Sequence, residues 1–208
     1  IGRNTGHVPL GGAQVWTFDA SGGEALTLFA VDAERGIDPL LRVRDPAGAI
    51  IALDDESGGG VSAFLPRVEL PERGTYTVEV GSFQNLSDGA YVLLVAEALP
   101  INNLKPGANS GRIAAGEAQV WRMELPVGQV VNLRVVTPNG SALDGLMTIT
   151  APSGEQAALN DDGDQPPNPF DPVISDFEIV EGGPYLVAVT SFNGATGGEY
   201  VLNLAVQD

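Results

Sequence analysis

The feature that most constrains the fold is a pair of β-type segments that occurs twice in the chain. Residues 75–80 alternate polar and apolar side chains, and residues 91–95 form a second apolar run after a polar loop. Such period-two alternation of aromatic and β-branched residues is typical of a half-buried strand. Both runs return near the C-terminus, with each aromatic residue 109 positions after its counterpart: Tyr76 and Tyr185, Phe83 and Phe192, Tyr91 and Tyr200. We therefore interpret the chain as organised around a duplicated hairpin.

A repeat of this length predicts two domains within the 208 residues. The first domain is predicted at residues 1–97 and the second at residues 109–208, joined by a linker at residues 98–108. Trp121 stands 105 positions after Trp16, so the offset grows from 105 to 109 through insertions in the second copy. Two prolines in the linker predict that it is semi-rigid.

The turn residues and the charge bound the class of protein. With 27 Gly and 15 Pro scattered between about eight short apolar runs per copy, the sequence predicts an all-β sandwich. The formal net charge of −17 excludes a basic surface for nucleic acid, and no apolar run is long enough to insert into a membrane. Because the chain contains no cysteine, disulfides and thiolate metal sites are absent.

Six short motifs follow one another along the first copy. They are Trp-Thr-Phe, Asp-Pro-x-Leu, Asp-Pro-x-Gly, Leu-Asp-Asp, Gly-Thr-Tyr-Thr-Val-x-Val and Gly-x-Tyr-x-Leu. In this order they resemble the bacterial pre-peptidase C-terminal domain, over nearly all of both copies. The second copy is the weaker match, because it has Gly145 and Ala151 where the first has Pro39 and Asp45.

The resemblance implies a specific fold and setting. It implies two tandem jelly-roll-like antiparallel β-sandwich domains, related to the collagen-binding modules of collagenases, in a secreted or cell-surface protein of bacteria or archaea. Domains of this family flank catalytic domains or stand in tandem, and are generally non-catalytic. Related modules bind calcium, polysaccharide or collagen.

Two acidic loops are the candidate metal sites. Calcium takes six to eight oxygen ligands, which flexible loops rich in Asp, Asn and Gly can supply. In each copy a further aspartate at the start of a neighbouring strand could close the site. The predicted calcium ligands are Asp38, Asp54 and Asp55 in the first copy, with Glu56 next to them, and Asp144, Asp161, Asp162 and Asp164 in the second. The alternative is that these residues only cap solvated turns.

The repeated aromatic residues have two interpretations. Trp16 and Trp121 could stack on sugars, or they could lie on the buried face of a sheet. Their matching positions inside alternating strands favour the core. The repeated tyrosines are likewise predicted to be core residues whose hydroxyl groups have a partner.

Little in the sequence supports catalysis. His7 is the single histidine, and the chain lacks a Gly-x-Ser-x-Gly elbow. Zinc sites usually need several His or Cys ligands. The sequence therefore predicts that the protein is not an enzyme.

The function predicted from the sequence is that of a non-catalytic extracellular module pair stabilised by calcium. Its predicted partner is a matrix or surface polymer, or further copies of itself. Two alternatives remain open: a structural subunit of an extracellular fibre or surface layer, and a C-terminal accessory segment of a secreted peptidase or other hydrolase.

Overall fold

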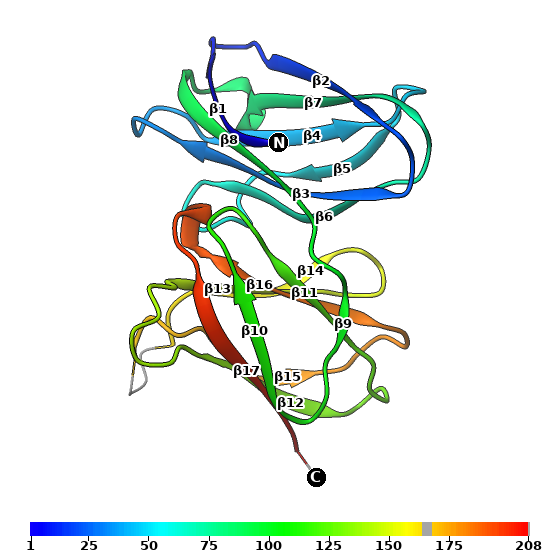
Figure 1. The fold of residues 1–208 in the computed structure, drawn as a ribbon, viewed down its shortest axis with the longest axis vertical. Helices are drawn as coiled ribbons and strands as arrows, with labels where there is room; N and C mark the ends of the chain where they lie inside the picture. The colour runs from blue at the N-terminus through cyan, green and yellow to red at the C-terminus, as the bar shows by residue number, and fades with distance from the viewer. Residues whose placement is uncertain (164–167, 208) are drawn as a thin grey trace. The chain divides into compact units, whose positions relative to one another are not determined.

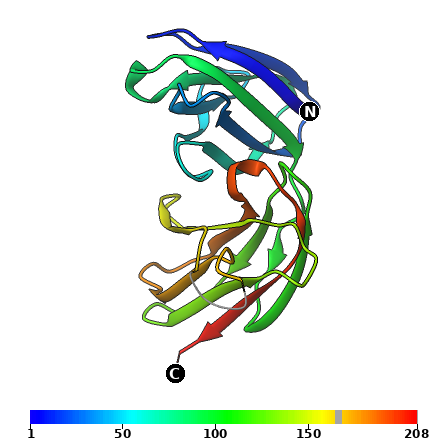
Figure 2. The same ribbon diagram turned by 90° about the vertical axis from the view of Figure 1, so that its left-hand side faces the viewer.

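The structure is a computed structural model that describes residues 1–163 and 168–207. By its internal contacts the chain divides into two units, Ile1–Ala98 and Leu99–Asp208, which are described separately below. The strands of each can be followed by colour in Figures 1 and 2. In the described residues the only helices are two 3-10 turns, η1 (Phe83–Asn85) and η2 (Phe192–Gly194). The predicted all-β class is confirmed.

The first unit contains eight strands in two antiparallel sheets. One sheet has the order β1-β8-β3-β6 and the other has the order β2-β7-β4-β5. Strand one therefore pairs with eight, two with seven, three with six and four with five, which is the pairing of a long hairpin rolled into a jelly roll. The strands are β1 (Gly2–Val8), β2 (Gln14–Ala20), β3 (Glu24–Asp32), β4 (Pro39–Arg44), β5 (Ile50–Asp54), β6 (Ala63–Leu70), β7 (Gly74–Ser82) and β8 (Gly89–Glu97).

The second unit repeats this topology and adds one strand. Its sheets have the orders β10-β17-β12-β15 and β14-β13-β16-β11-β9. Apart from β9, each strand matches one strand of the first unit in the same order. The strands are β9 (Asn102–Asn103), β10 (Gly107–Ile113), β11 (Gln119–Met123), β12 (Val130–Val136), β13 (Gly145–Thr150), β14 (Gln156–Asn160), β15 (Val173–Glu178), β16 (Tyr185–Ser191) and β17 (Gly198–Val206).

The sequence predicts that the two repeated strands pair as a hairpin, and this prediction is wrong. β7 pairs with β2 and β4, whereas β8 pairs with β1 and β3 in the opposite sheet. The connection between them contains η1, in which Gln84 has a φ of 51°, and it carries the chain from one sheet to the other. Period-two alternation identifies the buried face of each strand, but it does not identify the strand's neighbours.

The segment predicted as a linker belongs largely to the second unit. Residues 102 and 103 form β9, which lies parallel to β11 at the edge of its sheet (Figure 1). Leu104 is 8% exposed and belongs to the core of the second unit. Its backbone N–H donates to the carbonyl oxygen of Arg122 at 2.8 Å. This segment is therefore ordered by strand pairing and by burial of an apolar side chain.

The alternating strands bury the faces that their sequences predict. Tyr76, Val78 and Val80 of β7 are at most 2% exposed, and the core of each unit gathers such residues from both sheets. On β4, Leu41 and Val43 are buried, while Arg42 and Arg44 on the other face form ion pairs with Glu79. Each unit thus has its own apolar core between two sheets.

Candidate functional site

The repeated aromatic residues form a matching hydrogen bond in both units. The indole Nε1 of Trp16 donates to the hydroxyl of Tyr91 at 2.7 Å, and that of Trp121 donates to Tyr200 at 3.0 Å. Each bond joins β2 to β8, or β11 to β17, and so connects the two sheets of the sandwich. Burial raises the pKa of both tyrosines, because the phenolate would lose its hydration. The predicted core position is confirmed for Trp121 and for both tyrosines, whose hydroxyl groups have a partner, whereas Trp16 is only half-buried.

The other two tyrosines also serve structure. The hydroxyl of Tyr76 donates to the carbonyl of Glu72 at 3.0 Å, and that of Tyr185 accepts the N–H of Glu181 at 2.9 Å. Each tyrosine thereby fixes the turn that precedes its own strand, as a tyrosine corner does. The repeated tyrosines are therefore structural residues.

The strand order brings the predicted acidic residues of the first unit close together. β4 and β5 are antiparallel neighbours, with Leu41 opposite Asp54. Since Asp38 immediately precedes β4 while Asp55 and Glu56 immediately follow β5, these carboxylates lie at the same end of the sheet. The second unit places Asp144, Asp161 and Asp162 at the corresponding end of β13 and β14. We call these two sets of three carboxylates the acid groups.

One aspartate in each acid group has a raised pKa. Burial raises the pKa of Asp38, and the charges of Asp55 and Glu56 raise it further. Burial likewise raises the pKa of Asp144, with further contributions from Asp162 and Asp161. Like charges held together disfavour ionisation, and a bound cation would relieve this repulsion.

The coordination sphere of a metal ion is not assembled in either acid group. Within residues 1–163 and 168–207, no set of three or more His, Cys, Asp or Glu side chains is gathered tightly enough to hold an ion. Asp164, a predicted ligand, lies outside the described residues. Calcium binding therefore stays a prediction.

The carboxylate of Asp54, another predicted ligand, already accepts hydrogen bonds from other groups of the protein. Its carboxylate accepts hydrogen bonds from the backbone N–H of Phe64 at 2.7 Å, from the N–H of Ser57 at 3.0 Å and from the Ser57 hydroxyl. Burial raises the pKa of Asp54, and these hydrogen bonds act against that rise. In the second unit Asn160 takes the same place, and its Oδ1 accepts the N–H of Val173 at 2.7 Å. Asp54 and Asn160 therefore anchor the loop that leads into β6 or β15.

A groove of about 590 Å³ lies between the sheets of the first unit, beside the edge strand β2. Its apolar lining includes Trp16, Phe18, Leu26, Leu93 and Val95, and acidic residues stand among the remaining lining residues: Asp19, Glu24 and Glu97. Trp16 and Phe18 are only half-buried there, whereas their counterparts Trp121 and Met123 are 4% and 1% exposed. The groove is thus a place where the first unit leaves apolar surface uncovered.

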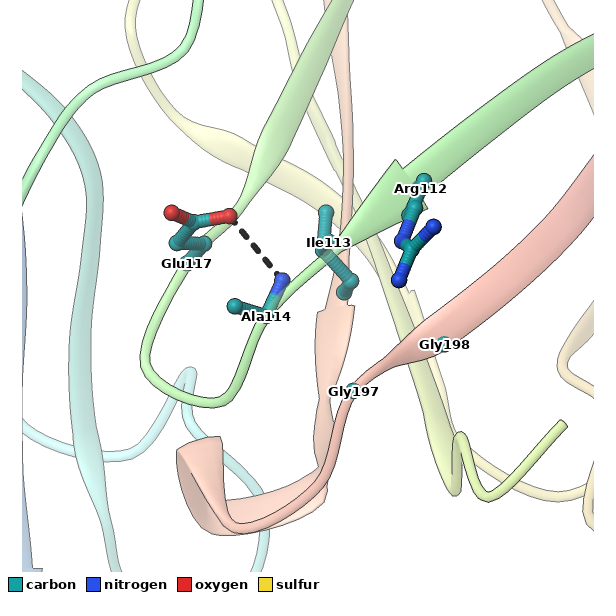
Figure 3. Close-up of a pocket in the computed structure, with 6 residues that line it drawn as sticks. All are labelled: Arg112, Ile113, Ala114, Glu117, Gly197 and Gly198. Atoms are coloured by element: carbon teal, nitrogen blue, oxygen red, sulfur yellow. Dashed lines mark hydrogen bonds between the residues drawn. The ribbon is translucent and has the colours of Figure 1, made fainter.

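A smaller hollow of about 400 Å³ lies in the second unit beside the turn between β10 and β11. Figure 3 shows Glu117 there, and its carboxylate accepts the backbone N–H of Ala114 at 2.9 Å. Arg112 lies on the other side of Ile113 in this view. The hollow contains neither a nucleophile nor a histidine, and its glutamate stabilises the turn.

The single histidine lies on an edge strand. His7 is exposed on the edge strand β1, where its backbone N–H donates to the side chain of Gln14 at 3.1 Å.

In the part of the chain that the structure describes, no helix is both long enough and apolar enough to cross a membrane.

Sequence reasoning missed two structural features of these sites. Gly6 and Gly111 lie opposite Tyr91 and Tyr200 across β1–β8 and β10–β17, and each leaves space for the tyrosine ring. Asp171, which is 1% exposed, accepts hydrogen bonds from Thr137 and anchors a loop of the second unit. The repeat of the glycines was a usable signal, but nothing near Asp171 in the sequence indicates its partner.

Comparisons with known proteins give matches to solved structures only. No family model matches the chain, and no curated protein matches it. The chain is similar to the pre-peptidase C-terminal domain of collagenase from Bacillus anthracis, with 16% identity and a TM-score of 0.40, over 51% of this chain and 95% of that one. It is also similar to PliG of Aeromonas hydrophila, a periplasmic inhibitor of g-type lysozyme, with 10% identity and a TM-score of 0.40, over 53% and 98% of the two chains. The PBSX exported protein XepA matches 98% of this chain and 85% of its own, with 14% identity and a TM-score of 0.36.

The predicted resemblance to a pre-peptidase C-terminal domain is confirmed to the extent that such a domain is among these matches. The match covers about half of the chain, so a tandem arrangement of such domains stays a prediction. At these identities and TM-scores, the likeness extends to no function of the three proteins.

Proposed function

We propose that the chain is a non-catalytic extracellular binding module in which each acid group holds a calcium ion. The observation that supports this most is the repeat of the acid groups at the same end of the same strand pair in both units. Asp38 and Asp144 remain under repulsion from their neighbours, whereas Asp54 is hydrogen-bonded within its own loop. A calcium ion would replace this repulsion by attraction.

The proposed partner is a matrix or surface polymer outside the cell, or further copies of the chain. The ordered motifs support this role through their resemblance to a family of secreted modules. A non-catalytic role also agrees with the structural hydrogen bonds of the conspicuous tyrosines. We place the protein among binding modules and not among enzymes on these grounds.

Calcium is expected to raise the melting temperature of the protein. A ligand that binds only the folded state stabilises it by about 2.7 kcal/mol at 100 times its dissociation constant. Melting in millimolar calcium should therefore occur several degrees higher than melting in chelator. Magnesium at the same concentration should have a smaller effect, because it needs near-ideal octahedral geometry.

Variants of the acid groups test the location of the ion. Asp38→Asn together with Asp144→Asn should abolish most of the calcium-dependent rise in melting temperature. Glu155→Gln removes one exposed carboxylate away from both acid groups and should leave that rise unchanged. Melting curves that superimpose with and without calcium in the parent protein would contradict the proposal.

The raised pKa values of Asp38 and Asp144 also predict a pH dependence in calcium-free buffer. A carboxyl whose pKa is higher in the folded state binds its proton more readily when folded. Its contribution to stability is present below the unfolded pKa, near 4, and is lost as the pH rises through the folded pKa. The parent protein should therefore lose more stability between pH 4 and pH 7 than the double Asn variant does. Equal losses, measured by urea unfolding, would exclude this contribution.

A further inference from the structure

The second unit shows what can cover the edge of its β11 strand. β9 pairs with β11 in parallel, with Asn102 opposite Trp121 and Asn103 opposite Arg122. Leu104 donates its N–H to the carbonyl of Arg122 and enters the core that contains Trp121. Residues 99–104 thus add a strand and also fill the space beside it.

The first unit has the matching edge without a matching strand. β2 corresponds to β11. The cross-strand pair of Thr17 and Thr77 in the first unit corresponds to the pair of Arg122 and Leu186 in the second. Among the described residues, β2 pairs with β7 alone and is the last strand of its sheet. Because the carbonyl of Arg122 points to β9, the backbone N–H and C=O of Thr17 point to the open side of β2.

The groove beside β2 corresponds to the space around Leu104. Four of its apolar lining residues have counterparts in the buried core that includes Leu104; the pairs are Leu26 and Val131, Val78 and Val187, Leu93 and Leu202, and Val95 and Leu204. In the first unit the groove has a volume of about 590 Å³, which is ample for an apolar side chain. The second unit therefore provides an internal precedent for an occupant of this groove.

The charge beside the groove adds a further requirement on the occupant. Asp19, Glu24 and Glu97 stand among the residues that line it. In the segment that covers the second unit, Lys105 directly follows Leu104. A basic residue after the apolar anchor would complement the acidic residues of the first unit.

We propose that the first unit binds an extended segment of a partner polypeptide, which pairs in parallel with β2 and inserts an apolar side chain into the groove. The segment has the pattern of residues 99–105, with an apolar anchor followed by a basic residue. A second copy would not supply this segment, because its own residues 102–104 are paired within its second unit. Strand addition of this kind draws affinity from main-chain hydrogen bonds and specificity from side-chain pockets. The inference deepens the proposed binding function by naming a class of partner.

A synthetic peptide, Leu-Pro-Ile-Asn-Asn-Leu-Lys, tests the proposal on the whole chain. Its titration should shift the amide NMR signal of Thr17 and the indole signal of Trp16 in a saturable way. A peptide with Asp in place of the second Leu should bind at least tenfold more weakly, because it would place a charge in the apolar groove. If neither peptide shifts these signals, or both do so equally, the proposal is overturned.

Two substitutions of Thr17 test the role of the strand edge. Thr17→Pro removes the outward N–H, which an edge strand tolerates, and should weaken peptide binding at least tenfold. Thr17→Val keeps the N–H and the β-branched shape, so it should bind the peptide like the parent. If Thr17→Pro does not fold, the pair of peptides on the parent chain still decides the matter.

The oligomeric state distinguishes a partner polypeptide from a second copy. The chain alone should sediment as a monomer at the concentrations of the titration. A dimer that the peptide dissociates would overturn the assignment to a separate polypeptide. Calcium melting and peptide binding are separate measurements, so either result can fail while the other stands.

Discussion

The variant Gly111→Ala is expected to melt at a temperature roughly 10 to 20 °C below that of the parent protein. A Cβ atom at position 111 would lie 2.3 Å from the ring of Tyr200, which is 1% exposed. The ring cannot move aside without breaking its hydrogen bond to Trp121. Overpacking of a closed core costs about 1–3 kcal/mol or more, and about 3 kcal/mol gives a shift of this size in a unit of about 100 residues.

Gly182→Ala is the matched control for this prediction. Gly182 has no atom within 4 Å of the position of an added Cβ, and its φ is not in the left-handed region. The same substitution there should change the melting temperature by no more than about 2 °C. If Gly111→Ala melted like Gly182→Ala, the close contact between strand β10 and the tyrosine ring would be refuted.

The second large effect is expected for Asp54→Ala. Alanine would leave the N–H groups of Ser57 and Phe64, and the Ser57 hydroxyl, without their acceptor. Ser57 and Phe64 are 9% and 1% exposed, and a buried donor without a partner costs about 1–3 kcal/mol. The expected loss in the free energy of unfolding is about 3 kcal/mol, measured by urea unfolding.

Asp54→Asn separates the hydrogen bonds from the charge. Asn160 occupies the matching place in the second unit, so an asparagine can accept the N–H that leads into the next strand. This variant should lose about 1 kcal/mol or less. An equal loss for Ala and Asn would show that the negative charge, and not the acceptor, stabilises this loop.

Much of the fold was predictable because burial follows the period-two pattern. Tyr76, Val78 and Val80 are buried as their alternation predicts. The repeat predicts that Tyr185 and Tyr200 are buried like their counterparts Tyr76 and Tyr91, and they are. Strand pairing was not predictable in the same way. The sequence shows β7 and β8 as neighbours along the chain, but their partners are β2, β4, β1 and β3.

The candidate site was predictable in part, because its aspartates also belong to the repeat. The repeat indicated that Asp38 and Asp144 lie near the acidic loops, and the strand pairing places them at the same end of the sheet as those loops. The structural role of Asp54 was hidden, because one of its donors, Phe64, stands ten residues further along the chain. The open edge of β2 became visible only through comparison with β11 and its partner strand.

The placement of one tryptophan in each unit has a practical consequence. The chain contains two tryptophans, and each unit holds one of them. Because Trp16 is half-buried and Trp121 is 4% exposed, their emission maxima should differ in the native protein. Each indole is therefore a native fluorescent reporter on its own sandwich, so the unfolding of the two halves can be recorded separately without any added label.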